Sequence, residues 1–319
     1  MIKMAARKTY RKASLAQRAA AAERRDGILN ELAAGIADLT TTEAWQRYLD
    51  VQSRFHRYSF ANTMLIMMQC PGATAVMPYG NAEKQTGWLG IGRQVRKGET
   101  GIRIWAPSTR KLDPAADRLK VIGPDGKLAK TEVLTGFRLV SVFDVSQTDG
   151  EPLPKPNRLL DGDDPAGLFA QLMDVAIELG FSVQVTPEIA GRPGANGICV
   201  FVGESGAEIT VAGSRSPAQK VKSEVHEIAH ALLHNGSIIT RGLKELEAES
   251  VAYVVCKYLG LDTSDYSFGY VAGWKGGDAE QAREAIKASG QRISGASKQI
   301  LDGLEAEREV EADRELEMA

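Results

Sequence analysis

Residues 216–253 read SPAQKVKSEVHEIAHALLHNGSIITRGLKELEAESVAY and contain three of the four histidines in the chain. His226 and His230 lie four positions apart, and Glu227 directly follows the first of them, which is the pattern H-E-x-x-H. On a helix this spacing places both imidazoles on one face, where they can bind one metal ion. Ser-Pro ahead of the pattern and Asn-Gly after it are typical start and end signals of a helix. We therefore predict a metal-binding helix.

The next predicted helix carries three glutamates that can complete the site, because catalytic zinc usually has three protein ligands and one water. If the two helices pack antiparallel across their short turn, Glu245 lies opposite His230. Glu249 then lies opposite His226, and Glu247 points away from that face. We predict Glu245 as the third ligand and Glu249 as the carboxylate that orients the ring of His226, with Glu249 as the alternative ligand. Zinc is the expected cofactor, and manganese or iron is also compatible with such donors.

Glu227 is the predicted catalytic residue of this site. It is not needed as a ligand, and a carboxylate beside a metal-bound water can accept the proton of that water and pass it to a leaving amine. His234 continues the spacing of four at the end of the helix, where we expect a capping or surface role instead of ligation. Tyr266 and Tyr270 follow in the sequence and could donate to an oxyanion, with ordinary packing as the alternative.

Composition indicates a globular protein of 319 residues, which is long enough for two domains. No apolar run approaches the length of a membrane span, and the basic, alanine-rich start lacks the apolar segment of a signal peptide. The three cysteines, Cys70, Cys199 and Cys256, are widely spaced among apolar neighbours, as buried thiols are. We therefore expect a cytoplasmic protein without membrane contact.

Charge is divided unequally between the two halves of the chain. Residues 1–160 carry 25 Lys and Arg against 15 Asp and Glu, whereas residues 161–319 carry 14 against 26. A basic half favours binding of a polyanion, and an acidic half does not. The first 26 residues are especially basic, and we expect a flexible extension there that could become helical on contact with a partner.

Aromatic and basic residues alternate at two places in the basic half. Residues 54–70 read RFHRYSFANTMLIMMQC, and residues 95–105 resemble a β-hairpin that presents Arg and Trp on one strand face. Flat rings beside cations are suited to single-stranded nucleic acid. The alternative is that the rings lie in the core and the arginines in solvent. The predicted contacts with single-stranded DNA are Arg54, Phe55, Arg57, Tyr58, Phe60, Trp88, Arg93, Arg96, Lys97, Arg103 and Trp105.

Elements of the second half are predicted from their periodicity and turn residues. We expect a helix over 165–179, a strand over 182–186, and a hairpin of 198–202 with 208–212 just before the metal helix. An edge strand there could pair with an extended peptide. The residues after 278 carry helical apolar stripes and then a run of acids, which predicts a terminal helix that frays into a solvated end.

Several of these motifs together resemble the ArdC-type antirestriction proteins of plasmids, phages and other mobile elements. They are RYSFANTMLIMMQCPGAT, GWLGIGRQVRKGETGIRIWAP, FRLVSVFDVSQTDGEPLP, HEIAHALLH, ELEAESVAYVV and LGLDTSDYSFGYVAGW, within about residues 40–275. The resemblance implies a first domain that binds single-stranded DNA and a second, zincin-like metallopeptidase domain similar in layout to ImmA/IrrE-type peptidases. The acidic partner four residues after Glu245 is Glu249, where gluzincin peptidases more often have Asp.

The predicted architecture is α+β with two domains. Its parts are a basic extension (1–26), a DNA-binding domain (27–149), a proline-rich linker (150–162), a zincin-like domain (163–276) and a helical acidic tail (277–319). The predicted function is an antirestriction-type protein that binds single-stranded DNA and hydrolyses a peptide bond, with a host protein as the candidate substrate. The alternative is a non-catalytic coat on incoming single strands, in which the zincin domain is structural or regulatory.

Overall fold

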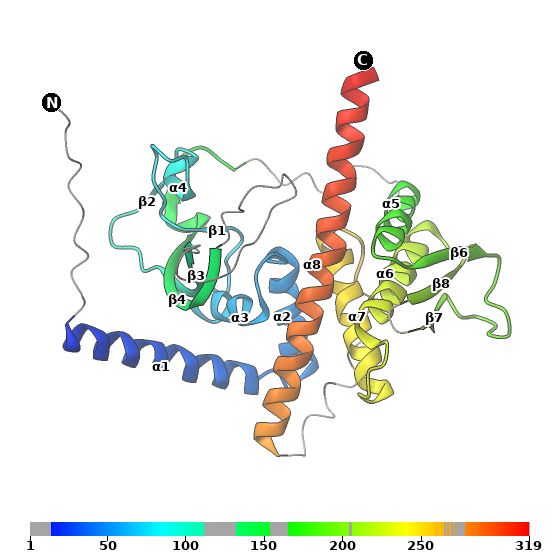
Figure 1. The fold of residues 1–319 in the computed structure, drawn as a ribbon, viewed down its shortest axis with the longest axis horizontal. Coiled ribbons are helices and arrows are strands. Elements are labelled where there is room, and N and C mark those ends of the chain that lie inside the picture. Colours follow the sequence, from blue (N-terminus) through cyan, green and yellow to red (C-terminus); the bar gives the residue numbers. More distant parts are fainter. Residues whose placement is uncertain are drawn as a thin grey trace.

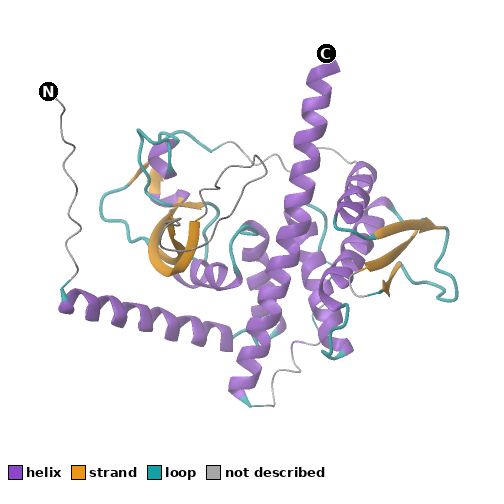
Figure 2. Cartoon of the chain, in the orientation of Figure 1, coloured by secondary structure: helices purple, strands orange, loops and turns teal. Residues whose placement is uncertain are grey.

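The computed structural model describes residues 14–111, 132–153, 165–203, 206–264, 266, 268, 271 and 278–318 (Figure 1). Within these residues the protein is a mixed α+β structure with eight α-helices and three small sheets, which confirms the predicted class (Figure 2). The first 13 residues of the basic extension, most of the proline-rich linker and Tyr270 lie outside the described residues. None of the described helices is both long and apolar enough to cross a membrane.

Helices and strands are unevenly distributed along the chain. The helices are α1 (Leu15–Ala37), α2 (Thr42–Arg54), α3 (Phe60–Gln69), α4 (Gly87–Gly90), α5 (Pro165–Glu178), α6 (Pro217–His234), α7 (Arg241–Tyr258) and α8 (Ala279–Met318). The strands are β1 (Val76–Met77), β2 (Gln94–Val95), β3 (Ile102–Lys111), β4 (Glu132–Asp144), β5 (Thr148–Asp149), β6 (Ser182–Thr186), β7 (Gly197–Val202) and β8 (Gly206–Ala212), and a 3₁₀ turn, η1, covers Val145–Gln147.

The first helix begins earlier than predicted. Ser14 forms a capping box with Gln17, each side chain bonding the backbone N–H of the other, and α1 runs from there without interruption. Residues 15–26, predicted as part of a flexible extension, are therefore helical. The reason is that alanine-rich sequence has high helix propensity, and a good cap is enough to begin the helix at Leu15.

The predicted hairpin over residues 95–105 is wrong. Val95 belongs to β2, which pairs with β5, whereas β3 pairs antiparallel with β4 over its whole length. The alternation within β3 is nevertheless as predicted. Ile102 and Ile104 are buried, and Arg103 on the opposite face is exposed. The partner strand lies beyond residues 112–131, so the local turn residues could not reveal it.

The sheet of the second half has the order β6-β8-β7, with β6 parallel and β7 antiparallel to β8. This confirms the predicted hairpin before the metal helix. β7 is an edge strand of this three-stranded sheet, and it lies against α6. Its outer residues Val200 and Val202 remain about half exposed.

One hydrophobic core joins the two halves. It extends from Leu32 in α1 to Leu304 in α8. The indole N–H of Trp45 in α2 donates to Ser250 Oγ in α7 at 3.0 Å, and the Tyr253 hydroxyl of α7 donates to Asp50 of α2 at 2.6 Å. Figure 1 shows α8 standing between the halves, and it contacts helices of both. The predicted acidic tail is thus, in its first part, a core helix.

Candidate metal centre and nucleic-acid groove

Helix α6 buries one apolar face in the core and leaves its two motif histidines on the other face. Ser216 caps the helix by accepting the N–H of Gln219 at 3.3 Å, and Pro217 occupies the first turn. Val225, Ile228 and Ala229 are fully buried on the inner face. The period of 3.6 residues then leaves the two histidines of the motif at the opposite side, partly accessible.

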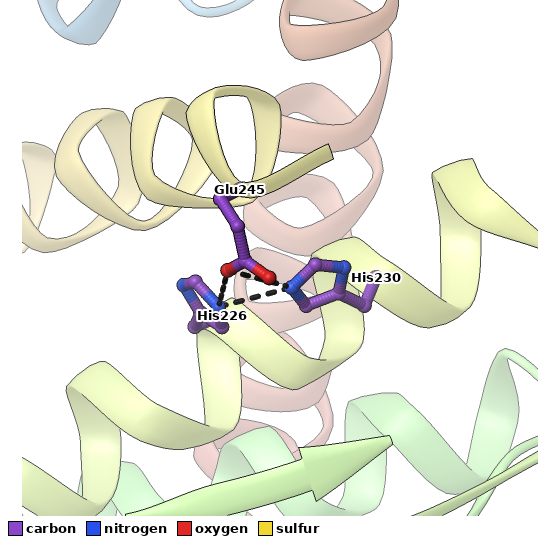
Figure 3. A group of neighbouring side chains, drawn as sticks. All are labelled: His226, His230 and Glu245. Carbon is purple, nitrogen blue, oxygen red and sulfur yellow. Dashed lines mark hydrogen bonds and ion pairs between the residues drawn. The ribbon is translucent and has the colours of Figure 1, made fainter. Parts of the chain in front are cut away.

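Helix α7 returns antiparallel after a short turn that contains Gly236 at a φ of 64°, a conformation that glycine adopts easily. The Thr240 hydroxyl caps α7 by accepting the N–H of Leu243 at 3.4 Å. The cap sets the start of the helix, so Glu245 falls in its second turn, facing α6. Figure 3 shows the carboxylate of Glu245 directed at the rings of His226 and His230.

The three predicted ligand side chains converge on one point. The Nε2 atoms of His226 and His230 are 3.0 Å apart, and Oε2 of Glu245 lies 3.5 Å and 3.6 Å from them. For a tetrahedral ion with bonds of about 2.0–2.1 Å, ligand atoms are about 3.3 Å apart. The three distances between donor atoms lie on either side of this value, so the donor set fits a single divalent ion of the zinc type.

Glu249 lies on the far side of His226. Its Oε1 is 3.8 Å from Nδ1 of that ring, and thus from the nitrogen opposite to the one that faces Glu245. Glu245 and Glu249 are one helical turn apart, so both reach the same ring from α7. This is the arrangement required if Glu245 is a ligand and Glu249 orients His226.

Electrostatics favour the metal-binding protonation states of His230 and Glu245. For His226, burial lowers the pKa, but a hydrogen bond with Glu245 and the charges of nearby glutamates outweigh it and raise that pKa. Burial, and then the neighbouring His226 and His234, lower the pKa of His230 to about 4. A hydrogen bond with His226 is the main cause that lowers the pKa of Glu245 to about 2. At neutral pH His230 is therefore uncharged and Glu245 is ionised, which are the metal-binding forms of both groups.

Glu227 is held in the cleft between α6 and β7. Its side chain is 8% exposed, and it accepts the backbone N–H of Cys199. Burial is the largest influence on this carboxyl and raises its pKa to about 7. A Cβ on Gly197 would lie 2.8 Å from Glu227 Cγ, so glycine is required there for the glutamate to fit. Such a pKa suits a proton acceptor that works near neutrality.

Two cavities adjoin the predicted ligands, and both are lined by His226 and Glu227. One has a volume of about 310 Å³, and its lining includes Lys222, Glu249 and Tyr266. The Tyr266 hydroxyl is not directed at the ligands. It donates to Cys256 Sγ at 3.6 Å, and burial is the main cause that raises its pKa.

The other cavity has a volume of about 420 Å³ and lies on the side of His230 and Glu245. Its lining includes Cys199 and Phe201 of β7, as well as Arg192. Because both cavities share the motif residues, an extended chain could pass the metal site along β7.

The prediction for His234 is wrong. Its side chain is fully buried, not at the surface, and its Nδ1 lies 2.8 Å from Nδ1 of His230. Glu247, predicted to point away from the ligand face, does so and contacts His234 Nε2 at 3.3 Å. The continued spacing of four residues was the signal in the sequence, but it could not show that α7 and α8 close over the end of α6.

A second candidate site lies in the first half, between α1 and the β3–β4 hairpin. It is a groove of about 790 Å³, which we call the basic groove. Trp105, Phe137 and Leu139 supply its apolar part, and four arginines and one glutamate supply the charges. These charged residues are Arg24, Arg25, Arg103, Arg138 and Glu31. Phe137 is 64% exposed, so a flat apolar ring is available there to a ligand.

Helix α3 fixes the strand that carries the groove. The Asn62 amide bonds both backbone groups of Trp105 at 2.8 Å, and the Gln69 amide bonds those of Arg103 at 2.8 and 2.9 Å. The two amides are seven residues apart, or about two helical turns, so both lie on the same face of α3. The groove wall is therefore held rigidly.

The eleven predicted DNA contacts do not form one surface. Arg103 and Trp105 line the basic groove, whereas Arg96 and Lys97 line a different hollow beside Tyr79. Arg54 and Arg57 are exposed, and Arg57 is paired with Glu305. Tyr58 is partly buried, with its hydroxyl bonded to Val76 O at 3.2 Å.

Four of the predicted contacts have buried side chains in this structure. Phe55, Phe60 and Trp88 pack in the interior, where large apolar rings gain most from loss of water contact. Arg93 is also buried, 5.9 Å from the ring centre of Trp88, and it donates to Thr148 Oγ1 at 2.8 Å. Arg93 also donates to the backbone carbonyls of Gly150 and Glu151, so it stabilises the loop after β5.

Known proteins resemble this chain in three comparisons. Residues 18–143 match the family model of the N-terminal domain of anti-restriction factor ArdC. An uncharacterized protein of Bacillus anthracis is 28% identical over 304 residues, which cover 82% of this chain and 49% of that protein. The chain therefore spans about half the length of the curated relative it matches.

Two crystal structures of the antirestriction ArdC protein from plasmid R388 also match. The metal-free structure is 18% identical with a TM-score of 0.42, and covers 78% of this chain and 86% of its own. The Mn(II)-bound structure is 17% identical with a TM-score of 0.44, and covers 77% and 85%. The match to the family model includes α2, α3 and the β3–β4 hairpin, on which the resemblance to ArdC-type proteins partly rests. The similarity to the ArdC N-terminal domain thus covers residues 18–143 of this chain.

Proposed function

We propose that this protein is an antirestriction-type protein that binds single-stranded DNA through its first half and hydrolyses a peptide bond at a metal centre in its second. The observation that carries the proposal is the convergence of His226, His230 and Glu245 beside the buried carboxyl of Glu227. A purely structural ion would not require a glutamate of raised pKa next to its ligands. The ArdC N-terminal domain supports the DNA-binding part.

The metal ligands are proposed to be His226, His230 and Glu245. A bound Zn²⁺ would polarise the carbonyl of the substrate and lower the pKa of a bound water. Two imidazoles and one carboxylate form the donor set of many hydrolytic zinc sites, and they leave room for water. Mn²⁺ accepts the same donors, so both ions belong in the binding experiments.

Glu227 is proposed to accept the proton of the attacking water and to return it to the leaving amine. Its pKa of about 7 places it close to the working pH of such a base. The N–H of Cys199 orients the carboxylate. Because that N–H is bonded to Glu227, it points away from β8 and towards the cleft.

The substrate is proposed to bind in extended form along β7. As an edge strand, β7 can pair the backbone groups of its outer edge with a peptide, except the Cys199 N–H, which is bonded to Glu227. Val200, Phe201 and Val202 are partly exposed along this strand, so apolar side chains of the peptide have a surface to contact. The proposed substrate is thus an unfolded or loop segment of a protein near the bound DNA.

The basic groove is proposed to bind the single strand. Arg103 and Arg138 can contact phosphates, and Trp105 and Phe137 offer rings for bases to stack on. Binding should weaken as salt increases, because counterions released from the strand are part of the driving force. The apolar rings should preserve some affinity at high salt.

The test compares the wild-type protein with Glu227→Gln, each loaded with zinc and checked for metal content. Protection of incoming DNA from restriction is measured in cells, and recovered host proteins are examined for cleavage. Glu284→Gln is the matched control, since Glu284 is an exposed residue of α8 paired only with Lys287 among the described contacts. The control should behave as wild type.

We expect Glu227→Gln to retain zinc and to bind single-stranded DNA. It should no longer protect incoming DNA from restriction, and no host protein should be cleaved. If protection is unchanged, hydrolysis is not required for it. The protein would then act as a coat on single strands, as in the alternative function, and the first half would carry the activity. If the variant also loses zinc, Glu227 has a structural role in the centre.

A further inference from the structure

The second nitrogen of His230 faces another imidazole. Its Nε2 is on the side of Glu245, and its Nδ1 is 2.8 Å from Nδ1 of His234. Metal-binding histidines usually donate their second N–H to a carboxylate, a carbonyl or water. Here the partner is a side chain without surface exposure, one helical turn farther along α6. The nitrogen of His230 that points away from Glu245 therefore contacts a buried side chain.

Only one arrangement of protons satisfies these contacts when His230 is a ligand. His230 must keep the lone pair of Nε2 for the metal, so its proton is on Nδ1. His234 then accepts that proton in a hydrogen bond through its own Nδ1 and carries its proton on Nε2. That proton is donated to Glu247 Oε2, 3.3 Å away. Each atom between the ligand and the carboxylate has a defined role.

Glu247 is anchored from α8. Its buried carboxylate accepts hydrogen bonds from Ser289 Oγ at 2.7 Å and from Arg292 Nε at 2.9 Å. A second nitrogen of Arg292 also donates to it. A buried carboxylate with this many donors has a stable geometry.

His234 is not a ligand in this arrangement. Its Nε2 is directed at Glu247, and its Nδ1 faces the nitrogen of His230 that points away from Glu245. The two ligand histidines thus differ in their support. His226 has the partly exposed Glu249 at 3.8 Å, whereas His230 is followed by the fully buried His234 and Glu247, and Glu247 is bonded to the partly exposed Arg292 of α8.

We propose that the buried His234 and Glu247, with Arg292 as their anchor on α8, form a relay that positions His230 and so sets the metal affinity of the centre. His234 is the positioning residue, and Arg292 makes the site depend on α8, which lies outside the H-E-x-x-H helix and its partner. The inference rests on the proposed metal site. Loss of the outer partner of a metal-bound histidine typically weakens metal binding by about 10- to 100-fold.

The experiment measures Zn²⁺ affinity of the full-length chain by competition with a chromophoric chelator. His234→Ala removes the acceptor, and His234→Asn restores an amide oxygen near the position of Nδ1. Arg292→Gln removes the charge that holds Glu247. Arg283→Gln is the matched control, because Arg283 is an arginine of the same helix that pairs with Glu280 near the helix start. His226→Ala tests the metal site itself.

We expect zinc affinity to fall about 10- to 100-fold in His234→Ala, to recover in part in His234→Asn, and to fall less in Arg292→Gln. Arg283→Gln should bind as wild type. In the zinc-loaded protein, the His230 Nδ1 proton should give a resolved, slowly exchanging NMR signal that His234→Ala abolishes. Simple loss of packing would not produce the recovery by asparagine.

Wild-type zinc affinity in His234→Ala, together with a clear loss in His226→Ala, would overturn the relay and leave the metal site in place. Unchanged affinity in His226→Ala would overturn the metal site and the relay with it. If His234→Ala does not fold, Arg292→Gln decides the question, since wild-type affinity in that variant would overturn the relay.

Discussion

The metal centre and the basic groove differ in how their residues are held. The proposed ligands come from two antiparallel helices, and their donor atoms are 3.0–3.6 Å apart and supported by buried contacts. In the groove, the rings and guanidinium groups come from α1 and a hairpin and are largely open to solvent. A centre that binds one small ion needs fixed geometry, whereas a flexible polyanion can be bound by side chains that adapt.

The two sites also lie in different halves of a molecule with one continuous core. Helix α8 contacts α1 and α3 on one side and α5, α6 and α7 on the other. The two sites share no residue, so a substitution that removes a contact atom at one site should leave the contacts of the other in place. Each prediction below tests this separation, from the largest expected effect to the smallest.

The largest effect is expected for Glu227→Gln on hydrolysis. Loss of a general base typically lowers the rate by about 10²- to 10⁴-fold. The affinity for a labelled single-stranded oligonucleotide should not change, because Glu227 lies in the second half. Cleavage of a random peptide library is followed by mass spectrometry, and DNA binding by fluorescence anisotropy. An equal loss of DNA affinity would show that the two sites are not separate.

The second effect concerns the opposite face of the metal helix. Glu224 is fully buried, both of its carboxylate oxygens lack a hydrogen-bond partner among the described residues, and burial is the main cause that raises its pKa to about 9. The folded form holds the proton more tightly than the unfolded chain. Its contribution to stability is therefore complete below about pH 4.3 and is lost as the pH rises towards 9.

Glu224→Gln should remove this loss, because the amide does not ionise. We expect the variant to be more stable than wild type at pH 9 by a few kcal/mol, at about 1.4 kcal/mol per pKa unit, and the difference to shrink below pH 5. Urea unfolding at several pH values measures this. Parallel pH profiles of the two proteins would contradict it.

The third effect is the loss of a stacking ring in the groove. Trp105→Ala should weaken single-stranded DNA binding by about 1–3 kcal/mol, with the metal content unchanged. Tyr79→Ala is the matched control, because Tyr79 is an exposed ring beside the other basic hollow, with Arg96 and Lys97. Fluorescence titration of both variants shows which surface binds. A larger loss of DNA affinity in Tyr79→Ala would place the DNA-binding site in that hollow instead.

The smallest effect is on salt dependence. Arg103→Gln should reduce the slope of log affinity against log salt by about 0.7, the value for one phosphate contact on a single strand. Arg96→Gln should change it less, since Arg96 is already paired with Glu99 at 2.8 Å and Asp149 at 3.5 Å. Equal slopes in the two variants would indicate that both hollows contact the strand.

The metal half could be predicted from sequence because its signals are local. Capping residues, the spacing of His226 and His230, and the short turn to Glu245 predict which side chains meet. The hairpin of β7 and β8 is also local and was predicted. His234 was misjudged because its burial depends on α8, which lies more than 40 residues later in the chain.

The groove could be predicted only in part. Alternating rings and cations near Phe55 and Trp88 reflect core packing, and sequence alone does not separate a buried ring from an exposed one. Arg138 and Phe137 were not predicted as contacts, because β4 is joined to β3 through a long segment. Arg24 and Arg25 were treated as part of a flexible extension, yet α1 carries them into the groove.

The central claim is that Glu245 completes the metal site. Glu245→Gln and Glu249→Gln are a matched pair, one turn apart on α7, and Zn²⁺ stoichiometry and affinity of both are measured beside wild type. We predict that Glu245→Gln loses most of its zinc affinity, while Glu249→Gln keeps one zinc per chain with a smaller loss. Retained affinity in Glu245→Gln with loss in Glu249→Gln would contradict this account and make Glu249 the ligand.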